Sequence, residues 1–166
     1  MPTTDMANQI ALLVEKRLKL EIEAQGHKLT NKLINSVGYV IERTGGDFAI
    51  TFDMEFYGAI LDKGVTAARI PFGGKGTGAK TSKYIQGLAR FAQLRFSANP
   101  KKALGIAFAI AHKQKKQGMP TNGSFKFSKT GKRTDFIGDT LRDVEKDIAT
   151  ILGRIQFDFE VILNAV

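Results

Sequence analysis

The chain of 166 residues is 43% apolar and 25% charged, which suits one soluble domain with a single core. It has no cysteine, which excludes disulfide bonds and thiolate metal sites and makes folding in a reducing cytoplasm the expectation. No apolar run approaches the ~18 residues that span a bilayer, and the amino terminus lacks the basic and apolar character of a secretory signal. We therefore expect no membrane segment.

The charged residues are distributed unevenly along the chain. From Lys63 to Arg133 there are sixteen Lys and Arg and no Asp or Glu, whereas the two flanks together hold nine basic and sixteen acidic residues, a net charge of −7. One explanation of this uneven distribution is that the sequence has drifted and its lysines keep the protein soluble. The other is that the surface has been selected against acidic residues. Such a surface attracts nucleic acid or the acidic face of a partner. Acidic flanks and a basic middle could also join neighbouring copies around a ring.

The amino-terminal region predicts helix. Apolar residues recur at helical spacing up to about Gln25, with charges between them, which indicates one long amphipathic helix within residues 1–26. Gly26 is its expected stop. The hydroxyl of Thr30 could cap a short second helix that ends near Val37.

The pattern then changes to strands. Residues 39–43 are rich in β-forming side chains, and apolar and polar residues alternate from Phe48 to Phe52. Gly45 and Gly46 between them permit the positive φ angles of a tight turn, so the two segments predict an antiparallel hairpin. Helical spacing returns over residues 55–61.

Two flexible loops, residues 65–81 and 119–133, are expected in the basic middle of the chain. Between them, Ser82 is the expected cap of a helix over residues 83–96. The apolar side chains expected on one side of this helix are Tyr84, Leu88, Phe91 and Leu94.

A second helix of the basic middle is predicted over residues 101–117, because Asn99 and Pro100 together form a good helix start. The segment from Ala103 to Ala111 is apolar all round and rich in small residues, which favours a buried helix. Gly118 is its expected end.

The carboxy-terminal region predicts a helix and then a strand. Apolar residues step by three and four over 137–152, with Thr134 or Asp135 as the N-cap. Apolar and polar residues alternate over 155–163, which predicts a half-buried strand. We expect this strand to pair with the hairpin. The predicted fold is therefore an α+β domain over residues 1–166, in which a small antiparallel sheet packs against several helices.

Catalytic motifs are weak in this sequence. The segment 73–81 is close to a phosphate-binding loop, but Ala79 separates the second glycine from the lysine, and no buried strand precedes it. The same glycines match the dinucleotide fingerprint equally weakly. His27 and His112 have no partners at metal-ligand spacing, and His112 is expected on a helix surface. We predict no enzyme activity, no cofactor and no metal.

Three carboxylates form a stripe along the last predicted helix. Asp139, Asp143 and Asp147 are four residues apart and therefore share one face. General acid–base chemistry needs carboxylates in a cleft with separated pKa values. A stripe opposite an apolar face predicts a charged surface instead.

The basic middle of the chain could contact nucleic acid. Phe125 and Phe127 lie among its lysines, and rings combined with cations hold single strands without reading their sequence. No helix-turn-helix or RNA-binding signature accompanies them, so a solvated basic loop with core or interface phenylalanines is the alternative. The residues that we expect to face DNA or an acidic partner are Lys75, Lys80, Lys113, Lys115, Lys116, Lys126, Lys129, Lys132 and Arg133.

Several segments have the order and character of one protein family. Residues 56–65 are FYGAILDKGV, in which a Tyr precedes an acidic residue and a closing Gly, and RIPF follows at 69–72. Residues 102–111, KALGIAFAIA, form an apolar helix that ends in a basic stop and Gly-Met-Pro at 118–120. Over roughly residues 30–166 the chain resembles the tail-completion (neck, head–tail joining) proteins of tailed bacteriophages. It differs in having Phe91 where the family often has Trp, and in its long glycine-rich insert.

The resemblance implies a structural virion protein, assembled in the host cytoplasm and located in the phage neck or tail. Such a subunit forms a ring with other copies of itself, contacts portal, connector or tail proteins, and lets DNA pass through the channel. Basic residues that face the channel would contact phosphates without reading sequence. The interface residues that the resemblance implies are Tyr57, Asp62, Gly64, Pro71 and Phe72. A basic nucleic-acid-binding accessory protein is the alternative function.

Overall fold

The structure, a computed structural model, describes residues 4–73, 82–121 and 133–153. The chain forms two compact units: unit 1 comprises residues 1–63 and 133–166, and unit 2 comprises residues 64–132. Unit 2 is thus an insertion between the two parts of unit 1. The prediction of one domain stays a prediction, because compactness does not show whether either unit folds alone.

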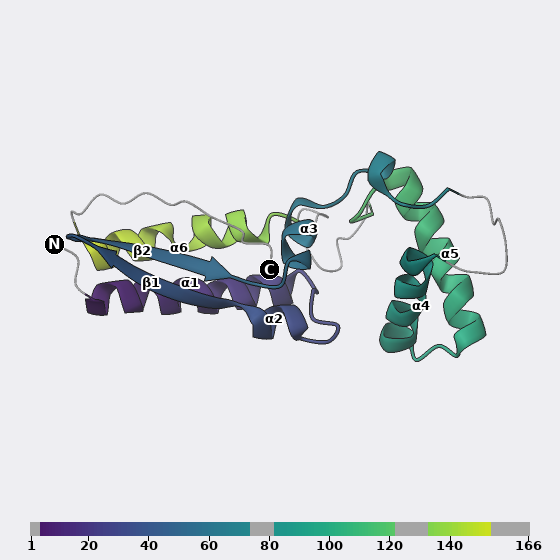
Figure 1. Ribbon diagram of the computed structural model, residues 1–166, viewed down its shortest axis with the longest axis horizontal. Helices are drawn as coiled ribbons and strands as arrows, with labels where there is room; N and C mark the ends of the chain where they lie inside the picture. Colours follow the sequence, from purple (N-terminus) through teal and green to yellow (C-terminus); the bar gives the residue numbers. More distant parts are fainter. Residues whose placement is uncertain (1–3, 74–81, 122–132, 154–166) are drawn as a thin grey trace. The chain divides into compact units, whose positions relative to one another are not determined.

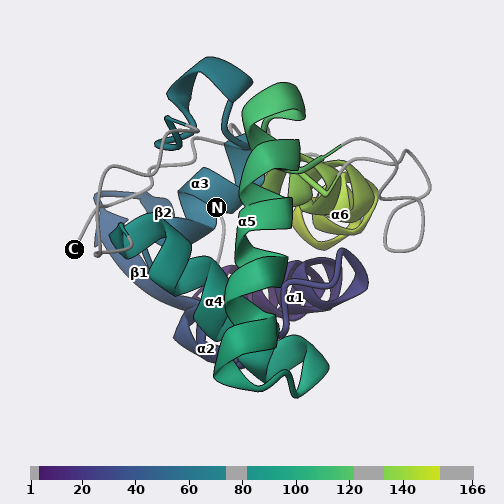
Figure 2. The same ribbon diagram turned by 90° about the vertical axis from the view of Figure 1, so that its right-hand side faces the viewer.

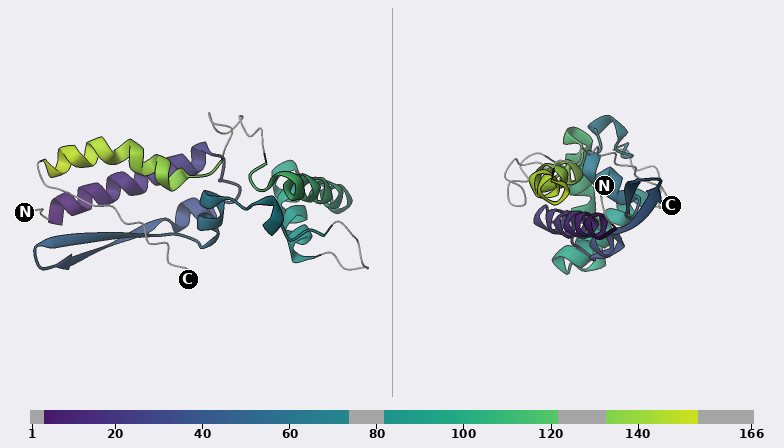
Figure 3. Two further views of the ribbon diagram at one scale, coloured as in Figure 1. Left: turned by 90° about the horizontal axis from the view of Figure 1, so that it is seen from above. Right: turned by 90° about the vertical axis from the view of Figure 1, so that its left-hand side faces the viewer.

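Two long helices form the centre of unit 1. They are α1 (Thr4–Ala24) and α6 (Phe136–Leu152), which lie side by side in Figures 1 and 3. The start of α1 packs against the end of α6, and the end of α1 packs against the start of α6. The two helices therefore run antiparallel. The core residues that they share are Ile10, Val14, Leu18, Ile22, Phe136, Val144, Ile148 and Leu152.

The predicted hairpin is confirmed. Strands β1 (Gly38–Thr44) and β2 (Asp47–Asp53) pair antiparallel, and Gly45 in the turn has a φ of +65°. Ile50 and Phe52 of β2 pack on the core between α1 and α6, so the hairpin covers a side of α1 (Figure 3). The α+β class is therefore confirmed. The predicted third strand, 155–163, lies outside the described residues.

The described part of unit 1 also contains two short helices. Helix α2 (Lys32–Ser36) follows Asn31, which has a left-handed φ of 55°, so the prediction that Thr30 caps this helix is wrong. Helix α3 (Tyr57–Lys63) packs closely through its buried Gly58. A Cβ atom there would lie 2.8 Å from Leu33 Cδ1, which is too close for any larger residue without a shift.

The described part of unit 2 contains the 3-10 turn η1 (Ala67–Arg69) and the helices α4 (Lys83–Phe96) and α5 (Pro100–Gln117), which lie side by side in Figure 2. Both predicted caps are confirmed. Ser82 Oγ accepts a hydrogen bond from Ile85 N, and Asn99 Oδ1 accepts one from Lys102 N. The described parts of the two predicted loops are tied together, because Val65 and Met119 exchange two backbone hydrogen bonds of 2.7 Å.

The prediction that α5 is a buried helix is wrong. Of the four apolar side chains expected on one side of α4, Tyr84 and Leu88 are half-buried against the core of the helix pair. Helix α4 buries Ile85 and Ala92, while Phe91 and Leu94 are exposed. Helix α5 is buried along one narrow stripe, so Leu104 and Phe108 are exposed although their segment is apolar all round. The reason is that alanines line the contact: they let the helices approach closely, and each helix then covers only a narrow part of the other. The fully buried alanines are Ala92, Ala103, Ala107 and Ala111.

Candidate interaction surfaces

The charge segregation seen in the sequence coincides with the division into units. Unit 2 carries fourteen Lys and Arg and no Asp or Glu, so its net charge is +14. Unit 1 carries eleven basic and sixteen acidic residues, a net charge of −5, and the two values give the chain's +9. The acid-free stretch, Lys63 to Arg133, extends one residue beyond unit 2 at each end. One compact body is therefore wholly basic and the other is acidic overall.

The lysines at the end of α5 divide into two kinds. Lys113 and Lys116 are exposed on the helix. Lys102 is eleven residues before Lys113, and Lys116 is three residues after it, so the three lysines share one side of the helix, called here its flank. Lys115 Nζ instead donates a hydrogen bond to the carbonyl of Ile70 at 3.2 Å and so holds the segment after η1. All three predicted contact lysines in α5 are thus exposed, and Lys115 also has a structural partner.

The predicted motif residue Phe72 packs against α5. Its ring meets that of His112 edge-on, with 4.8 Å between centroids, and lies 6.3 Å from the ring of Phe108. Pro71 is exposed beside it. His112 is exposed on its helix, as the sequence predicted. Phe72 therefore packs the segment after η1 against α5, which is a structural role within unit 2.

Arg133 belongs to unit 1 and is bound within it, which corrects its grouping with the lysines that face a partner. Its Nε donates to the carbonyl of Gln25 at 2.5 Å, and its Nη2 donates to the carbonyl of Gly26 at 2.9 Å. These carbonyls follow the end of α1, where a cation is favourable because helix carbonyls lack partners there. Arg133 thus caps α1 at the point where the chain returns from unit 2.

His27 lies beneath this cap. Its Nε2 is 3.1 Å from the carbonyl oxygen of Arg133, and its ring is 5.9 Å from that of Phe136. Burial, helped by the positive charge of Arg133, lowers the pKa of His27 to about 4, so the ring is neutral at pH 7. Sequence reasoning missed this role, because the partner of His27 is 106 residues away along the chain.

Asp62 caps α6 from another element. Its Oδ1 accepts a hydrogen bond from Ile137 N at 3.0 Å, and its carbonyl accepts one from Asp135 N at 2.7 Å. Burial raises the pKa of Asp62, the Ile137 N–H opposes the rise, and the Asp135 carboxylate adds to it. Asp135 occupies the predicted N-cap position, but its side chain makes no capping bond within the described residues. The motif residue Asp62 therefore has a structural role.

The other predicted motif residues lie on either side of Asp62. Tyr57 is exposed at the start of α3. Gly64, the first residue of unit 2, has a φ of +71°, a conformation that favours glycine. Together with Asp62, they mark the segment through which the chain leaves unit 1.

The carboxylate stripe on α6 is partly neutralised. Asp143 pairs with Arg17 of α1, and Asp139 pairs with Arg142 at 2.5 Å. Asp147 and Glu145 are exposed and form no ion pair within the described residues. This arrangement provides negative surface charge and no cleft for acid–base chemistry.

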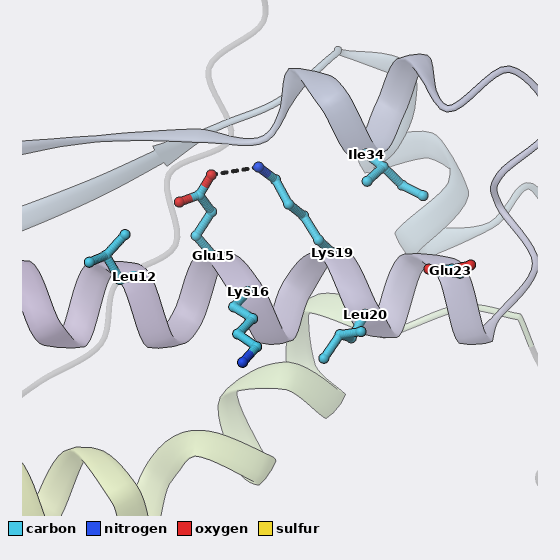
Figure 4. Close-up of a pocket in the computed structure, with 7 residues that line it drawn as sticks. All are labelled: Leu12, Glu15, Lys16, Lys19, Leu20, Glu23 and Ile34. Carbon is cyan, nitrogen blue, oxygen red and sulfur yellow. Dashed lines mark hydrogen bonds and ion pairs between the residues drawn. The ribbon is translucent and has the colours of Figure 1, made fainter.

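A shallow hollow of about 410 Å³ lies on α1 (Figure 4). Leu12 and Leu20 of α1 and Ile34 of α2 supply its apolar lining. Two glutamates and two lysines surround them, including the Glu15–Lys19 ion pair at 2.6 Å. Because the charges balance, the hollow selects neither anions nor cations.

The remaining predicted contact residues, Lys75, Lys80, Lys126, Lys129 and Lys132, lie outside the described residues. Within the described ranges, no group of three or more His, Asp or Glu side chains could hold a metal ion. In the same ranges, no helix is both long and apolar enough to cross a membrane. Comparison with known proteins finds no matching family model, curated protein or solved structure.

Proposed function

We propose that this protein is a structural virion subunit of a tailed phage, of the head–tail joining or tail-completion kind, which assembles into a ring with copies of itself. The observation that carries the assembly part is the division of charge: +14 on unit 2 and −5 on unit 1. Because the two units of one chain carry opposite net charges, a contact in which unit 2 of one copy meets unit 1 of the next is favoured. Such a contact is heterologous, and repeated around an axis it closes into a ring.

The phage part of the proposal rests on the sequence segments at 56–72 and 102–120. The partners proposed beyond the ring are portal, connector or tail proteins, and DNA in the channel. The final location proposed is the virion, after assembly in the host cytoplasm.

The proposal predicts assembly that depends on salt. Sedimentation velocity at about 50 mM salt should show species larger than the 18.2 kDa chain, and at about 500 mM they should dissociate, because the Debye length shortens. K113E/K116E should weaken assembly, since both lysines are exposed in unit 2. The matched control is K16E, an exposed lysine of unit 1. A wild-type chain that stays monomeric at both salt concentrations would contradict the proposal.

A basic nucleic-acid-binding accessory protein is the second candidate. The observation that favours it is the flank of α5 that carries Lys102, Lys113 and Lys116 in a unit without acids. It predicts a monomer or dimer whose DNA affinity falls with salt, with a logarithmic slope of about −0.9 for each phosphate contacted. Fluorescence anisotropy with labelled DNA, titrated with salt, separates this candidate from a ring that assembles without DNA.

A further inference from the structure

We propose that copies of this protein join head to tail through two exposed apolar faces. The end of α4 in unit 2 of one copy packs against α3 in unit 1 of the next. This inference rests on the proposed function and deepens it, because it names the contact by which the ring would close.

The face on unit 2 is centred on Phe91, near the carboxy-terminal end of α4. Leu94, three residues on, lies on the same side of the helix as Phe91, and the ring of Phe96, the last residue of α4, contacts the ring of Phe91. The rings of Phe91 and Phe96 are nearly perpendicular, at 86°, with 6.1 Å between centroids. The two phenylalanines therefore already contact each other, and little ordering would be needed on binding. Arg90 is exposed on the same helix, and no acidic residue occurs in the unit.

The face on unit 1 consists of Phe56, Tyr57 and Ile60, at the start of α3 and along it. Helix α3 turns Gly58 toward unit 1, so the large side chains are left on its outside. All six side chains of the two faces are between 36% and 56% exposed. Clusters of large exposed apolar side chains in a folded protein mark surfaces that bind another protein.

Charge decides which surface covers the α4 face. Two copies of unit 2 would bring +14 against +14, which repels, whereas unit 1 carries −5 and attracts. Within the α4 face, Leu94 offers a base no ring to stack on, which favours a protein partner over a single strand. Unit 1 of a second copy is therefore the occupant that we propose.

Within unit 1, α3 suits this contact better than the hollow on α1. The three large side chains of α3 lie within five residues, whereas Leu12 and Leu20 of α1 are eight residues apart with the charged Lys16 between them. Six side chains correspond to the apolar centre of an interface, which typically covers ~800 Å² on each partner and has a polar rim. The charged surfaces of the two units would provide that rim.

The contact can be tested by complementation between two variants of the full chain. Variant A is F91S/L94S, which breaks the face on unit 2, and variant B is F56S/I60S, which breaks the face on unit 1. Each variant alone should assemble at least about 100-fold more weakly than wild type, because central apolar side chains dominate binding. An equal mixture should form a dimer of twice the 18.2 kDa chain mass and nothing larger, because only one intact contact can form.

Controls and alternative outcomes separate the contact from the proposed function. L12S/L20S removes equally exposed leucines and should assemble as wild type does. Circular dichroism checks that every variant keeps its helices. If wild type assembles but variants A and B assemble equally well, or if their mixture gives no dimer, this contact is wrong and the proposed function stands. A wild-type chain that stays monomeric removes both.

Discussion

Unit 1 and unit 2 are held together by different means. Unit 1 buries several large side chains, among them Ile22, Leu33 and Phe136, whereas the fully buried residues of α4 and α5 are alanines, joined by Ile85 as the large buried side chain of the contact. A fully buried Leu, Ile or Phe contributes about 1.5–3 kcal/mol, and an alanine contributes far less. The charged side chains of unit 2 are also all positive, so they repel one another. The comparison indicates that the core of unit 1 stabilises it more than the core of unit 2 stabilises unit 2.

The largest expected effect tests the core of unit 1. Phe136 is fully buried, so Phe136→Ala should lower the free energy of unfolding by about 3–5 kcal/mol. The matched variant Phe108→Ala in unit 2 should cost only about 1–2 kcal/mol, because that residue is 38% exposed. Urea denaturation followed by circular dichroism measures both. Similar losses from the two variants would refute the contrast between the units.

The second effect is a pH dependence that belongs to unit 1. The pKa of His27 falls from 6.5 in the unfolded chain to about 4 in the folded one, so the unfolded chain binds the proton more tightly. Stability should be constant above about pH 6.5 and decrease toward pH 4, by roughly 2 kcal/mol at pH 5. Thermal unfolding at several pH values measures this. His27→Gln should remove the part of the slope of stability against pH that His27 causes. The control His112→Gln, at an exposed position of α5, should keep that slope. A slope unchanged in His27→Gln would show that this ring is not responsible.

A third, smaller effect tests the cap of α6. Asp62→Ala removes the acceptor for Ile137 N and should cost about 1 kcal/mol. Asp62→Asn should cost less, because an amide oxygen still accepts the bond. Asp53→Ala, an exposed carboxylate of the same unit, is the control and should change stability little. Chemical denaturation compares the three variants, and equal losses in Asp62→Ala and Asp53→Ala would argue against the cap.

The smallest expected effect is a difference between the units in how their stability changes with salt concentration. Raising the salt concentration from about 0.05 to 0.5 M should stabilise α4 and α5 by roughly 0.5 kcal/mol, because screening reduces repulsion among like charges. Helices α1 and α6, which carry both signs, should gain less. Amide hydrogen exchange resolves the two helix pairs in one experiment. Equal protection changes in both pairs would mean that like-charge repulsion does not weaken unit 2.

Much of the fold was predictable because it depends on neighbours in sequence. The long first helix, the hairpin at Gly45 and the caps at Ser82 and Asn99 all follow from spacings of a few residues. The packing faces of α4 and α5 were not predictable in the same way. An apolar side chain such as Phe108 can be buried or exposed depending on how closely the facing helix approaches, and periodicity does not contain that distance.

The candidate site divides similarly. Counting charges located the basic body to within one residue at each end, because charge is a property of composition. The roles of Asp62 and Arg133 did not follow from the sequence pattern, which grouped them with interface and contact residues. Their partners, Ile137, Gln25 and Gly26, are 75 to 108 residues away along the chain.

By itself, the amino-acid sequence determined the local elements and the sign of charge on each part of this protein, since both arise from residues close together in the chain. The tertiary structure alone decided which apolar side chains are covered and which charged groups are bound inside a unit. Both depend on distances between segments that are remote in sequence. For that reason the exposed faces on α3 and α4, on which the proposed contact depends, became evident only in the folded chain.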